Sequence, residues 1–455
     1  MGRRIVVVGG GAAGGTAAQF ARKTDRNAEI TVFEAGKYPQ YSKCALPYLI
    51  SKKVKNVVEF SEEWFKHANI NLLLGTMVKE VDVKSRRVLA EHDGETIETG
   101  YDSLILATGA NSAIPPIPGV VNESGGLTKG VFLLRTLDDA YAISSFIPRV
   151  QHAVIVGAGA IGLEMAEALY SHGVKVTVVE MLPSILPGML DSDTAGVLQK
   201  AIPEDILILT GHRVLGVEKE GDVVKKVSVE NEEGEQKTLE ADMVLIATGI
   251  KANSEVAKKI GCKIGEYGGV SIDGRCRTSL EGVYAVGDCT EYLDFVTQKP
   301  FLVGLGSIAV RQGIVAGVNA AGGRMFLPEG FVQTRTTKLF GVEVAAVGPT
   351  LKQIQNINPV TGRFTGGTLP DYFPGGEEVT VKVAVNPADG VVVAAQAVGV
   401  DAAQRINVFA CAIMNKMSVE ALSQMETAYA PPVAPTLDPL TIACDVARMR
   451  YVRKR

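Results

Sequence analysis

The chain contains one short unit of sequence twice. In each copy an apolar run enters the pattern Gly-x-Gly-x-x-Gly, a stretch of helical periodicity follows at 12–23 or 160–172, and a β-rich stretch then ends in an acid, Glu34 or Glu180. A buried strand, a glycine turn, a helix and a second strand form a βαβ unit with parallel strands. The duplication therefore predicts two parallel sheets covered by helices. The glycines are Gly9, Gly11 and Gly14 in the first copy and Gly157, Gly159 and Gly162 in the second.

A second shared motif marks the end of each unit. A strand is followed by an Ala-Thr-Gly turn at 107–109 and again at 247–249. Three prolines and a glycine within 115–119 interrupt the chain between the units, as a linker does. A later apolar run ends at Gly287 and Asp288, and we expect it to return to the first sheet.

The glycine pattern has a physical use in binding dinucleotides. The first glycine permits a tight turn, the second lets the backbone approach a pyrophosphate, and the third lets the helix pack closely on the strand. The terminal acids, Glu34 and Glu180, would accept hydrogen bonds from ribose hydroxyls. An acid at this place repels a 2'-phosphate, so Glu180 favours NADH over NADPH, although Lys175 lies near enough in sequence to compensate. The alternatives are a turn that serves packing alone and an acid that only caps its strand.

The last third of the chain has a different texture. Val-rich segments at 379–385 and 391–398 precede a helical stretch at 402–425, which favours an antiparallel sheet with helices. We therefore expect an α/β fold with two Rossmann-like dinucleotide-binding domains, the second inserted in the first, and a C-terminal α+β domain. The expected boundaries are 1–112 and 250–329 for the first dinucleotide-binding domain, 113–249 for the second and 330–455 for the C-terminal domain.

Charge, hydropathy and cysteine spacing exclude several classes of protein. The net charge is -4, with acids and bases mixed along the chain, so no basic field for nucleic acid is expected. The sequence has no run of about 18 apolar residues and no signal-peptide core, which predicts a cytoplasmic protein without a membrane-spanning helix. The six cysteines form no CxxC pair, so we expect neither a disulfide framework nor a metal site.

The order of these motifs resembles that of the flavoprotein disulfide reductases with two dinucleotide-binding domains, and the resemblance covers essentially the whole chain. It implies that the first fingerprint holds FAD, that the inserted domain holds NADH or NADPH, and that the C-terminal domain forms a homodimer. The implied FAD contacts are Gly9, Gly11, Ala13, Gly14, Glu34, Val78, Ala107, Thr108, Gly109, Gly287, Asp288 and Ala309. The implied nicotinamide contacts are Gly157, Gly159, Ala160, Ile161, Gly162, Glu180 and Gly249.

The redox residue indicates the branch of this superfamily. Glutathione reductase and its relatives carry a CxxxxC pair after the first unit, whereas this chain has only Cys44 there. A single cysteine resembles the branch of coenzyme A-disulfide reductase, NADH oxidase, NADH peroxidase and persulfide reductase. The peroxidases normally carry a histidine in the first glycine turn, and this chain reads Gly-Ala-Ala-Gly at 11–14. Lys43 and the expected following helix would favour the thiolate of Cys44, and a buried inert cysteine is the alternative.

Other side chains receive roles by the same resemblance. Tyr429 matches a tyrosine that reaches the partner's active cysteine, where a phenol would help the departing thiolate. Tyr372 falls near a second family tyrosine, although Phe373 follows it where the family often has another tyrosine. Arg22 and Ser42 are candidate coenzyme A contacts. Each could instead be structural or solvated.

We therefore expect an FAD-dependent NAD(P)H:disulfide oxidoreductase that reduces coenzyme A disulfide, or a related coenzyme A or thiol persulfide, through Cys44. The sulfur of Cys44 would be a mixed disulfide with coenzyme A, a persulfide or a sulfenic acid, and the homodimer would share its active sites between subunits. One alternative on the same scaffold is a polysulfide or persulfide reductase or an NADH oxidase. A flavin redox sensor or an electron-transfer subunit is an alternative from another class.

Overall fold

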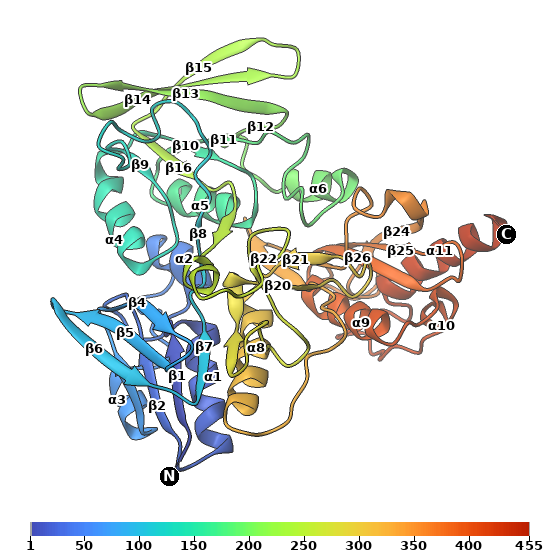
Figure 1. Cartoon of the computed structure of the whole chain (residues 1–455). Helices are drawn as coiled ribbons and strands as arrows, with labels where there is room; N and C mark the ends of the chain where they lie inside the picture. Colours follow the sequence, from blue (N-terminus) through green and yellow to red (C-terminus); the bar gives the residue numbers. More distant parts are fainter. Residues whose placement is uncertain (1, 455) are drawn as a thin grey trace.

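The computed structural model describes residues 2–454 and contains two five-stranded parallel sheets and one five-stranded antiparallel sheet. Figure 1 shows them as three lobes, with the C-terminal lobe at the side of the other two. The expected fold class is confirmed. Helices and parallel strands alternate in the first two lobes, and strands and helices form separate layers in the third.

The first parallel sheet is built from both ends of the first dinucleotide-binding domain. β19, from far along the chain, pairs in parallel with β7 and completes the sheet after the inserted domain, as the run ending at Asp288 predicted. The strand that leads into the first glycine turn is buried along almost its whole length, which a parallel sheet covered on both faces requires. In sheet order the strands are β19 (Val283–Ala285), β7 (Ser103–Leu106), β1 (Arg4–Val8), β2 (Glu29–Phe33) and β3 (Ile70–Leu73).

Two long helices pack against one another beside this sheet. A Cβ atom added to Gly317 would lie 2.2 Å from the Ala17 carbonyl oxygen, so these helix backbones approach too closely for a side chain between them. The two long helices are α1 (Ala12–Thr24) and α8 (Gly306–Ala320). The smaller elements of the domain are α2 (Leu46–Ile50), α3 (Glu62–His67), α7 (Glu255–Lys259), the sheet β4 (Thr76–Asp82), β5 (Arg87–His92) and β6 (Glu95–Gly100), and the sheet β18 (Val270–Ser271), β20 (Thr290–Leu293) and β21 (Pro300–Leu302).

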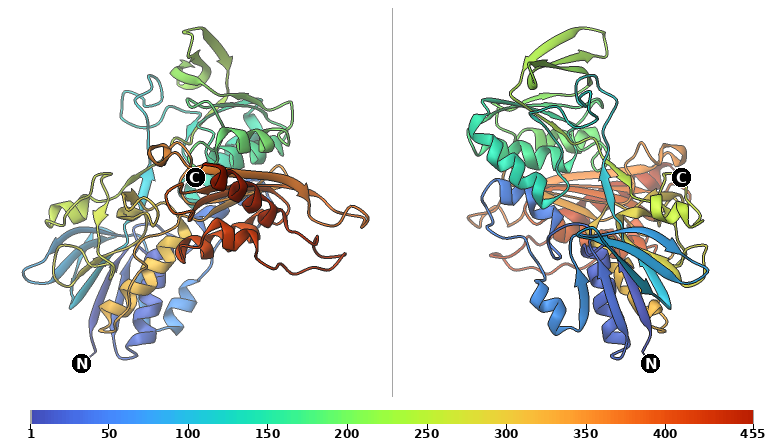
Figure 2. Two further views of the ribbon diagram at one scale, coloured as in Figure 1. Left: turned by 90° about the vertical axis from the view of Figure 1, so that its right-hand side faces the viewer. Right: turned by 60° about the vertical axis from the view of Figure 1, so that its left-hand side comes forward.

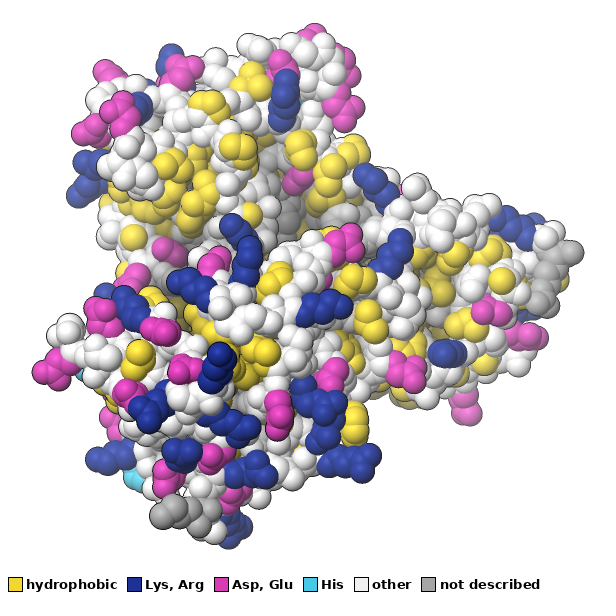
Figure 3. All heavy atoms as spheres, in the orientation of Figure 1, with side chains coloured by type: hydrophobic (Ala, Val, Ile, Leu, Met, Phe, Trp, Pro, Cys, Tyr) yellow, Lys and Arg dark blue, Asp and Glu magenta, His cyan; other side chains and the backbone are white. Residues whose placement is uncertain are grey.

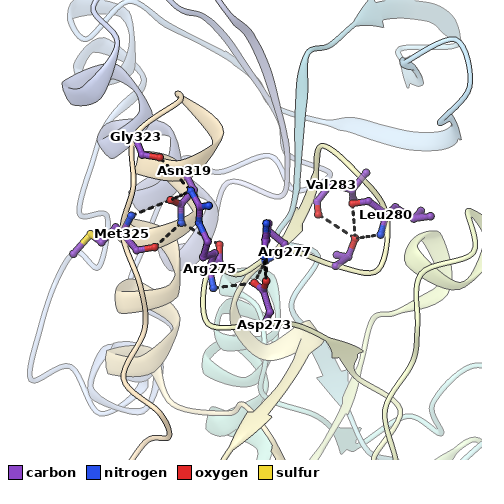
Figure 4. Close-up of polar contacts among 9 residues, drawn as sticks. Asp273, Arg275, Arg277, Leu280, Val283, Asn319, Gly323 and Met325 are labelled. Carbon is purple, nitrogen blue, oxygen red and sulfur yellow. Dashed lines mark hydrogen bonds and ion pairs between the residues drawn. The ribbon is translucent and has the colours of Figure 1, made fainter.

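Asn319 ties the end of α8 to the neighbouring loop of the second part of this domain. Its side-chain amide donates to the carbonyls of Arg275 and Met325, at 3.2 and 2.9 Å, and its oxygen accepts from the Met325 amide at 3.0 Å. Figure 4 shows the Asn319 side chain between these two segments, with Arg277 turned toward Asp273 nearby. One buried amide therefore fixes the separation of two loops.

The inserted domain repeats the first arrangement. Its parallel sheet contains, in order, β12 (Leu207–Leu209), β11 (Lys175–Val179), β10 (His152–Val156), β16 (Met243–Ile246) and β9 (Val131–Phe132). Around it lie α4 (Leu137–Phe146), α5 (Ala160–Tyr170), α6 (Ser192–Gln199), the sheet β13 (His212–Glu220), β14 (Val223–Asn231) and β15 (Gln236–Glu240), and the pair β8 (Ala110–Ser112) and β17 (Ile250–Ala252) that joins the two domains.

The C-terminal sheet has two buried faces with different neighbours. Val381 and Ala397 point to one face, which packs on three helices, whereas Val344, Ala346 and Val398 belong to the same apolar cluster as the core of the inserted domain. Strand alternation produces both faces. In sheet order the strands are β22 (Arg335–Leu339), β23 (Val342–Val347), β26 (Val392–Gly399), β25 (Glu378–Val385) and β24 (Val360–Gly367), and the helices are α9 (Ala402–Met414), α10 (Val419–Ser423) and α11 (Pro439–Lys454).

Two expected helices have different bounds. The stretch 402–425 is two helices and not one, because the first ends at Met414 and the second begins after Ser418, whose hydroxyl accepts from the Ala421 amide at 3.2 Å. The second fingerprint helix ends at Tyr170, two residues before the expected end. Within residues 2–454, no helix is long and apolar enough to cross a membrane.

Candidate functional site

The first glycine turn is shaped by the backbone that surrounds it. Gly9 has a φ of +105°, and a Cβ atom there would lie 2.2 Å from the Ala107 carbonyl oxygen. A Cβ atom on Gly14 would lie 1.9 Å from the Gly9 carbonyl oxygen. Only glycine fits either position, so α1 begins directly against the turn.

Glu34 is fixed beside this turn at the end of β2. Its carboxylate accepts from the backbone amides of Gly10 at 2.6 Å and Gly36 at 2.7 Å. Two amides thus orient a carboxylate at the edge where a ribose would lie.

The second turn reproduces this geometry. Gly157 also has a φ of +105°, and a Cβ atom there would lie 2.5 Å from the Ala247 carbonyl oxygen. A Cβ atom on Gly162 would lie 2.0 Å from the carbonyl oxygen of Gly157. Glu180 accepts from the amides of Ala158 at 2.8 Å and Leu182 at 2.9 Å. The duplication in sequence is therefore also a duplication of hydrogen bonds.

Asp288 is the middle residue of a short 3-10 turn (Gly287–Cys289) after β19. Its carboxylate forms an ion pair with Arg135, whose Nε donates to the Ala110 carbonyl at 2.8 Å. The sequence did not predict Arg135, because no motif surrounds it and 153 positions separate it from Asp288.

Three small residues meet beside Asp288. A Cβ atom on Gly287 would lie 2.9 Å from the Ala13 Cβ and 3.7 Å from the Ala309 Cβ, so the two long helices converge on this turn. Nearby, the Thr108 hydroxyl donates to the Asn253 carbonyl at 2.6 Å. Three other predicted cofactor residues lie in regular elements. Val78 is buried in β4, and in the first turn of α5 Ala160 begins the helix and Ile161 is exposed.

Cys44 lies in a 3-10 turn (Lys43–Ala45) directly before α2, and its side chain is exposed. The surrounding protein nevertheless raises the pKa of its thiol, first by desolvation and then through the charges of Glu164 and Asp288, while Arg135 opposes the shift. Lys43, which the sequence predicts to favour the thiolate, is not among the main influences on this pKa, and burial and Arg135 lower the pKa of Lys43 itself, so its role stays a prediction. The helix that follows has five residues.

Three lobes contribute one side chain each near this cysteine. The Thr337 hydroxyl, on β22, donates to the Glu164 carboxylate, on α5, at 2.6 Å. Burial raises the pKa of Glu164. Burial also raises the pKa of the Tyr48 phenol on α2, and a hydrogen bond with Thr337 opposes that shift. Tyr48 and Glu164 line one small hollow. Figure 3 shows hydrophobic side chains gathered at the junction between the upper lobe and the lower one.

The two predicted tyrosines lie together. The hydroxyls of Tyr372 and Tyr429 are 2.9 Å apart, and both side chains are exposed, by 71% and 48%. Their hydrogen bond raises the pKa of Tyr372. The loops that carry them project from the same side of the C-terminal lobe in Figure 2. Within residues 2–454 no hydrogen bond joins either tyrosine to Cys44.

The predicted coenzyme A contacts have different surroundings. The Arg22 guanidinium donates to the carbonyls of Ala68, Arg26 and Asn69, at 3.1, 2.8 and 2.5 Å, so it already stabilises local backbone. Ser42 precedes the turn of Cys44, and its hydroxyl forms no capping hydrogen bond there.

Comparison with known proteins identifies the family. The pattern of the pyridine nucleotide-disulphide oxidoreductases matches residues 3–313, and that of their dimerisation domain matches residues 334–440. The chain belongs to this family. Pyridine nucleotide-disulphide oxidoreductases of this kind depend on FAD and NAD(P)H, and the chain is therefore an oxidoreductase with a dimerisation domain.

Relatives within the family carry several names. An NADH oxidase of Methanocaldococcus jannaschii is 38% identical over 99% of this chain and 100% of its own length. A CoA-dependent NAD(P)H sulfur oxidoreductase of Pyrococcus abyssi is 34% identical over 98% of both chains. A coenzyme A disulfide reductase of Staphylococcus haemolyticus is 28% identical over 94% of this chain and 96% of its own length. The solved structure of an NAD-dependent persulfide reductase from A. fulgidus is 36% identical, with a TM-score of 0.92 over 98% of this chain and 83% of that one.

The two turns have room for the cofactors of this family. A Cβ atom added to any of four glycines would meet no atom within 4 Å, so the backbone is open where a cofactor would approach. The carboxylates beside the turns supply acceptors for hydroxyls. The residues therefore fit FAD in the first domain and a nicotinamide dinucleotide in the second. The open glycines are Gly11 and Gly109 in the first domain and Gly159 and Gly249 in the second.

Proposed function

We propose that this oxidoreductase uses NADH to reduce coenzyme A disulfide, or a persulfide carried by coenzyme A or a related thiol, through Cys44. The observation that carries the proposal is the position of Cys44, an exposed sulfur on which charges from both dinucleotide-binding domains act, Asp288 from the first and Glu164 from the second. The names of the Pyrococcus and Staphylococcus relatives support an acceptor that involves coenzyme A.

The chain's own residues would have distinct tasks. Glu34 and Asp288 would hold hydroxyls of FAD, and Glu180 would hold the adenosine ribose of NADH and disfavour a 2'-phosphate. Bound FAD would supply the hydride's electron pair, which breaks the sulfur-sulfur bond of the mixed disulfide between Cys44 and coenzyme A, so that one coenzyme A leaves and the Cys44 thiolate remains. The Cys44 thiolate then attacks the substrate disulfide, so that one sulfur-sulfur bond forms as another breaks.

The departing thiolate needs a proton. We propose that the partner subunit's Tyr429 supplies it, supported by Tyr372 through their hydroxyl pair. Both tyrosines are exposed and neither is hydrogen-bonded to Cys44 of its own chain, which favours an active site shared between two subunits. Coenzyme A would remain on Cys44 as the mixed disulfide between turnovers.

Cys44→Ser tests the assignment. The variant should keep NADH-dependent flavin reduction and lose turnover of coenzyme A disulfide, because hydride transfer does not need the sulfur whereas disulfide exchange does. Stopped-flow absorbance and steady-state NADH consumption measure the two steps. Intact mass before and after treatment with a thiol reductant should show loss of a coenzyme A-sized adduct from the native protein only. Undiminished disulfide turnover in the variant would refute the proposal.

Oxygen is the second candidate acceptor, since the Methanocaldococcus relative is named an NADH oxidase. NADH consumption measured with coenzyme A disulfide, with polysulfide and with oxygen alone separates these activities. Turnover with oxygen alone that equals the rate with either sulfur acceptor would favour the oxidase.

A further inference from the structure

A charged side chain lies on the face of the C-terminal sheet that packs on the inserted domain. Lys382, on β25, has a side chain that is 7% exposed and forms ion pairs with Asp191 at 2.9 Å and Asp193 at 2.6 Å. Its cross-strand neighbour on β26 is Gln396, which is also buried and accepts from the Asp191 amide at 2.9 Å. Both aspartates belong to the inserted domain, at the start of α6.

Asp191 is held from a third side as well. Its carboxylate accepts from the Leu351 amide at 2.9 Å, so three segments of the C-terminal domain converge on this residue. Nearby, Arg335 of β22 donates to the carbonyl of Gly188. The stretch from 181 to 191 is therefore anchored to the C-terminal domain at its far end.

The near end of this stretch belongs to the second dinucleotide turn. It begins directly after Glu180, whose carboxylate accepts from the Ala158 amide, and the Ala158 carbonyl accepts in turn from the Leu186 amide at 2.9 Å. The Leu190 amide donates to the Leu186 carbonyl at 2.9 Å, which closes a turn that leads to Asp191. Hydrogen bonds, joined by the chain itself between Asp191 and Leu190, thus connect the C-terminal sheet to the glycine turn.

Leu186 itself is in the left-handed region, with a φ of +49°. For a residue with a branched side chain this conformation is unfavourable and persists only where the surroundings impose it. A buried ion pair is a weak source of stability, since desolvation offsets most of its attraction, and its better attested use is to fix one geometry. These two observations point to a segment whose shape is imposed by its anchors.

We propose that Lys382 and Gln396 are positioning residues for the nicotinamide dinucleotide, because they hold the segment 181–191 in the shape that presents Glu180 and the glycine turn to NADH. The inference rests on the proposed binding of NADH at Glu180 and adds that the dimerisation domain sets the affinity of that site. Both residues contact Asp191, so each acts through that residue.

The test uses the purified FAD-containing enzyme and three variants. Lys382→Met removes the charge and keeps the length of the side chain, and Lys382→Arg restores the charge. Val381→Ala is the matched control, because Val381 is the preceding residue on β25, is fully buried and faces the helices on the opposite side of the sheet. The dissociation constant of NADH is obtained from the dependence of the flavin reduction rate on NADH concentration, and the melting temperature is recorded for each variant.

Lys382→Met should raise the NADH dissociation constant about fivefold or more, the low end of measured couplings between sites. The arginine variant should recover most of the native affinity. Val381→Ala should lower the melting temperature and leave the NADH dissociation constant unchanged. An unchanged constant in Lys382→Met, or an equal rise in Val381→Ala, would overturn the proposal.

A second variant and a measurement without an electron acceptor keep the test of Lys382 decisive. If Lys382→Met yields no folded enzyme, Gln396→Leu removes the acceptor of the Asp191 amide without removing a charge, and the same predictions apply. Flavin reduction is measured without any acceptor, so the result does not depend on what Cys44 reduces. If NADH does not reduce the flavin of the native enzyme, the proposed function itself is contradicted.

Discussion

Cys44 is surrounded by groups that hold the proton on its sulfur. Desolvation, Glu164 and Asp288 all raise the pKa of its thiol, and among the main influences only the Arg135 guanidinium lowers it. A thiol with a raised pKa is a poor nucleophile at neutral pH, because the thiolate is the reactive form. Bound cofactor and substrate must therefore supply the stabilisation of the Cys44 thiolate that the chain alone does not.

Alkylation of the flavin-free protein measures this shift, once a thiol reductant has removed coenzyme A from Cys44 and has itself been removed. Because the pKa of Cys44 is raised above its ordinary value of 9.0, the rate of reaction with iodoacetamide should rise with pH through a midpoint above 9.0. Arg135→Leu should move the midpoint higher still, since it removes the nearby cation. Cys44→Ser gives the background from Cys411, which is also exposed. A midpoint below 9.0 would contradict the prediction.

At this scale the sequence predicts residues that sit within motifs and misses those that do not. Gly9, Glu34 and Glu180 could be placed because strand, turn and terminal acid have fixed spacing within a βαβ unit. The ion pair of Arg135 with Asp288 depends on how two domains meet, which local sequence does not record. The raised pKa of Cys44 is not recorded in local sequence either, because its largest cause is burial and the next is the charge of Glu164 in the inserted domain.

Among the elements, α1 and α8 pack backbone against backbone in the FAD domain. Gly313 and Gly317 of α8 lie where the two helices touch, and a Cβ atom on Gly317 would lie 2.2 Å from the Ala17 carbonyl oxygen. The sequence predicted α1 from its place after a glycine turn. It did not predict the break at 415–418, because the apolar pattern continues across both helices and only the Ser418 cap marks the new start.

Gly317→Ala should lower the free energy of unfolding by about 1–3 kcal/mol, since the added methyl group forces two packed helices apart. Chemical denaturation of the FAD-containing enzyme measures the change. Gly196→Ala is the control, because Gly196 is also inside a helix but has no atom within 4 Å of an added Cβ. Alanine there should be neutral or stabilising by about 0.5–1 kcal/mol through the helix backbone alone. Equal losses in both variants would show that helix packing is not the cause.

On the scale of the whole molecule, the arrangement of the exposed tyrosine pair and Cys44 favours a site completed by a second copy. Complementation tests this directly. Cys44→Ser and Tyr429→Phe homodimers should each turn over disulfide slowly. The rate of the Tyr429→Phe homodimer should be about 100-fold below that of the native enzyme, a typical loss for a general acid. A mixed dimer of the two variants should regain activity, because one of its two sites then contains native Cys44 and native Tyr429.

The control is a dimer that mixes native and doubly substituted chains. If sites are shared, each of its sites lacks one of the two side chains, and the dimer should have little activity. Recovery in this dimer and not in the mixed single variants would place both residues in one subunit.

The core of the inserted domain continues into one face of the C-terminal sheet, where Leu339, Val344, Ala346 and Val398 join it. A fragment that stopped near residue 330 would leave this apolar surface in water, where it would promote association with other chains. The nicotinamide-binding lobe is thus no detachable module, and deletions or fusions in proteins of this design must keep the distant C-terminal strands to leave it intact.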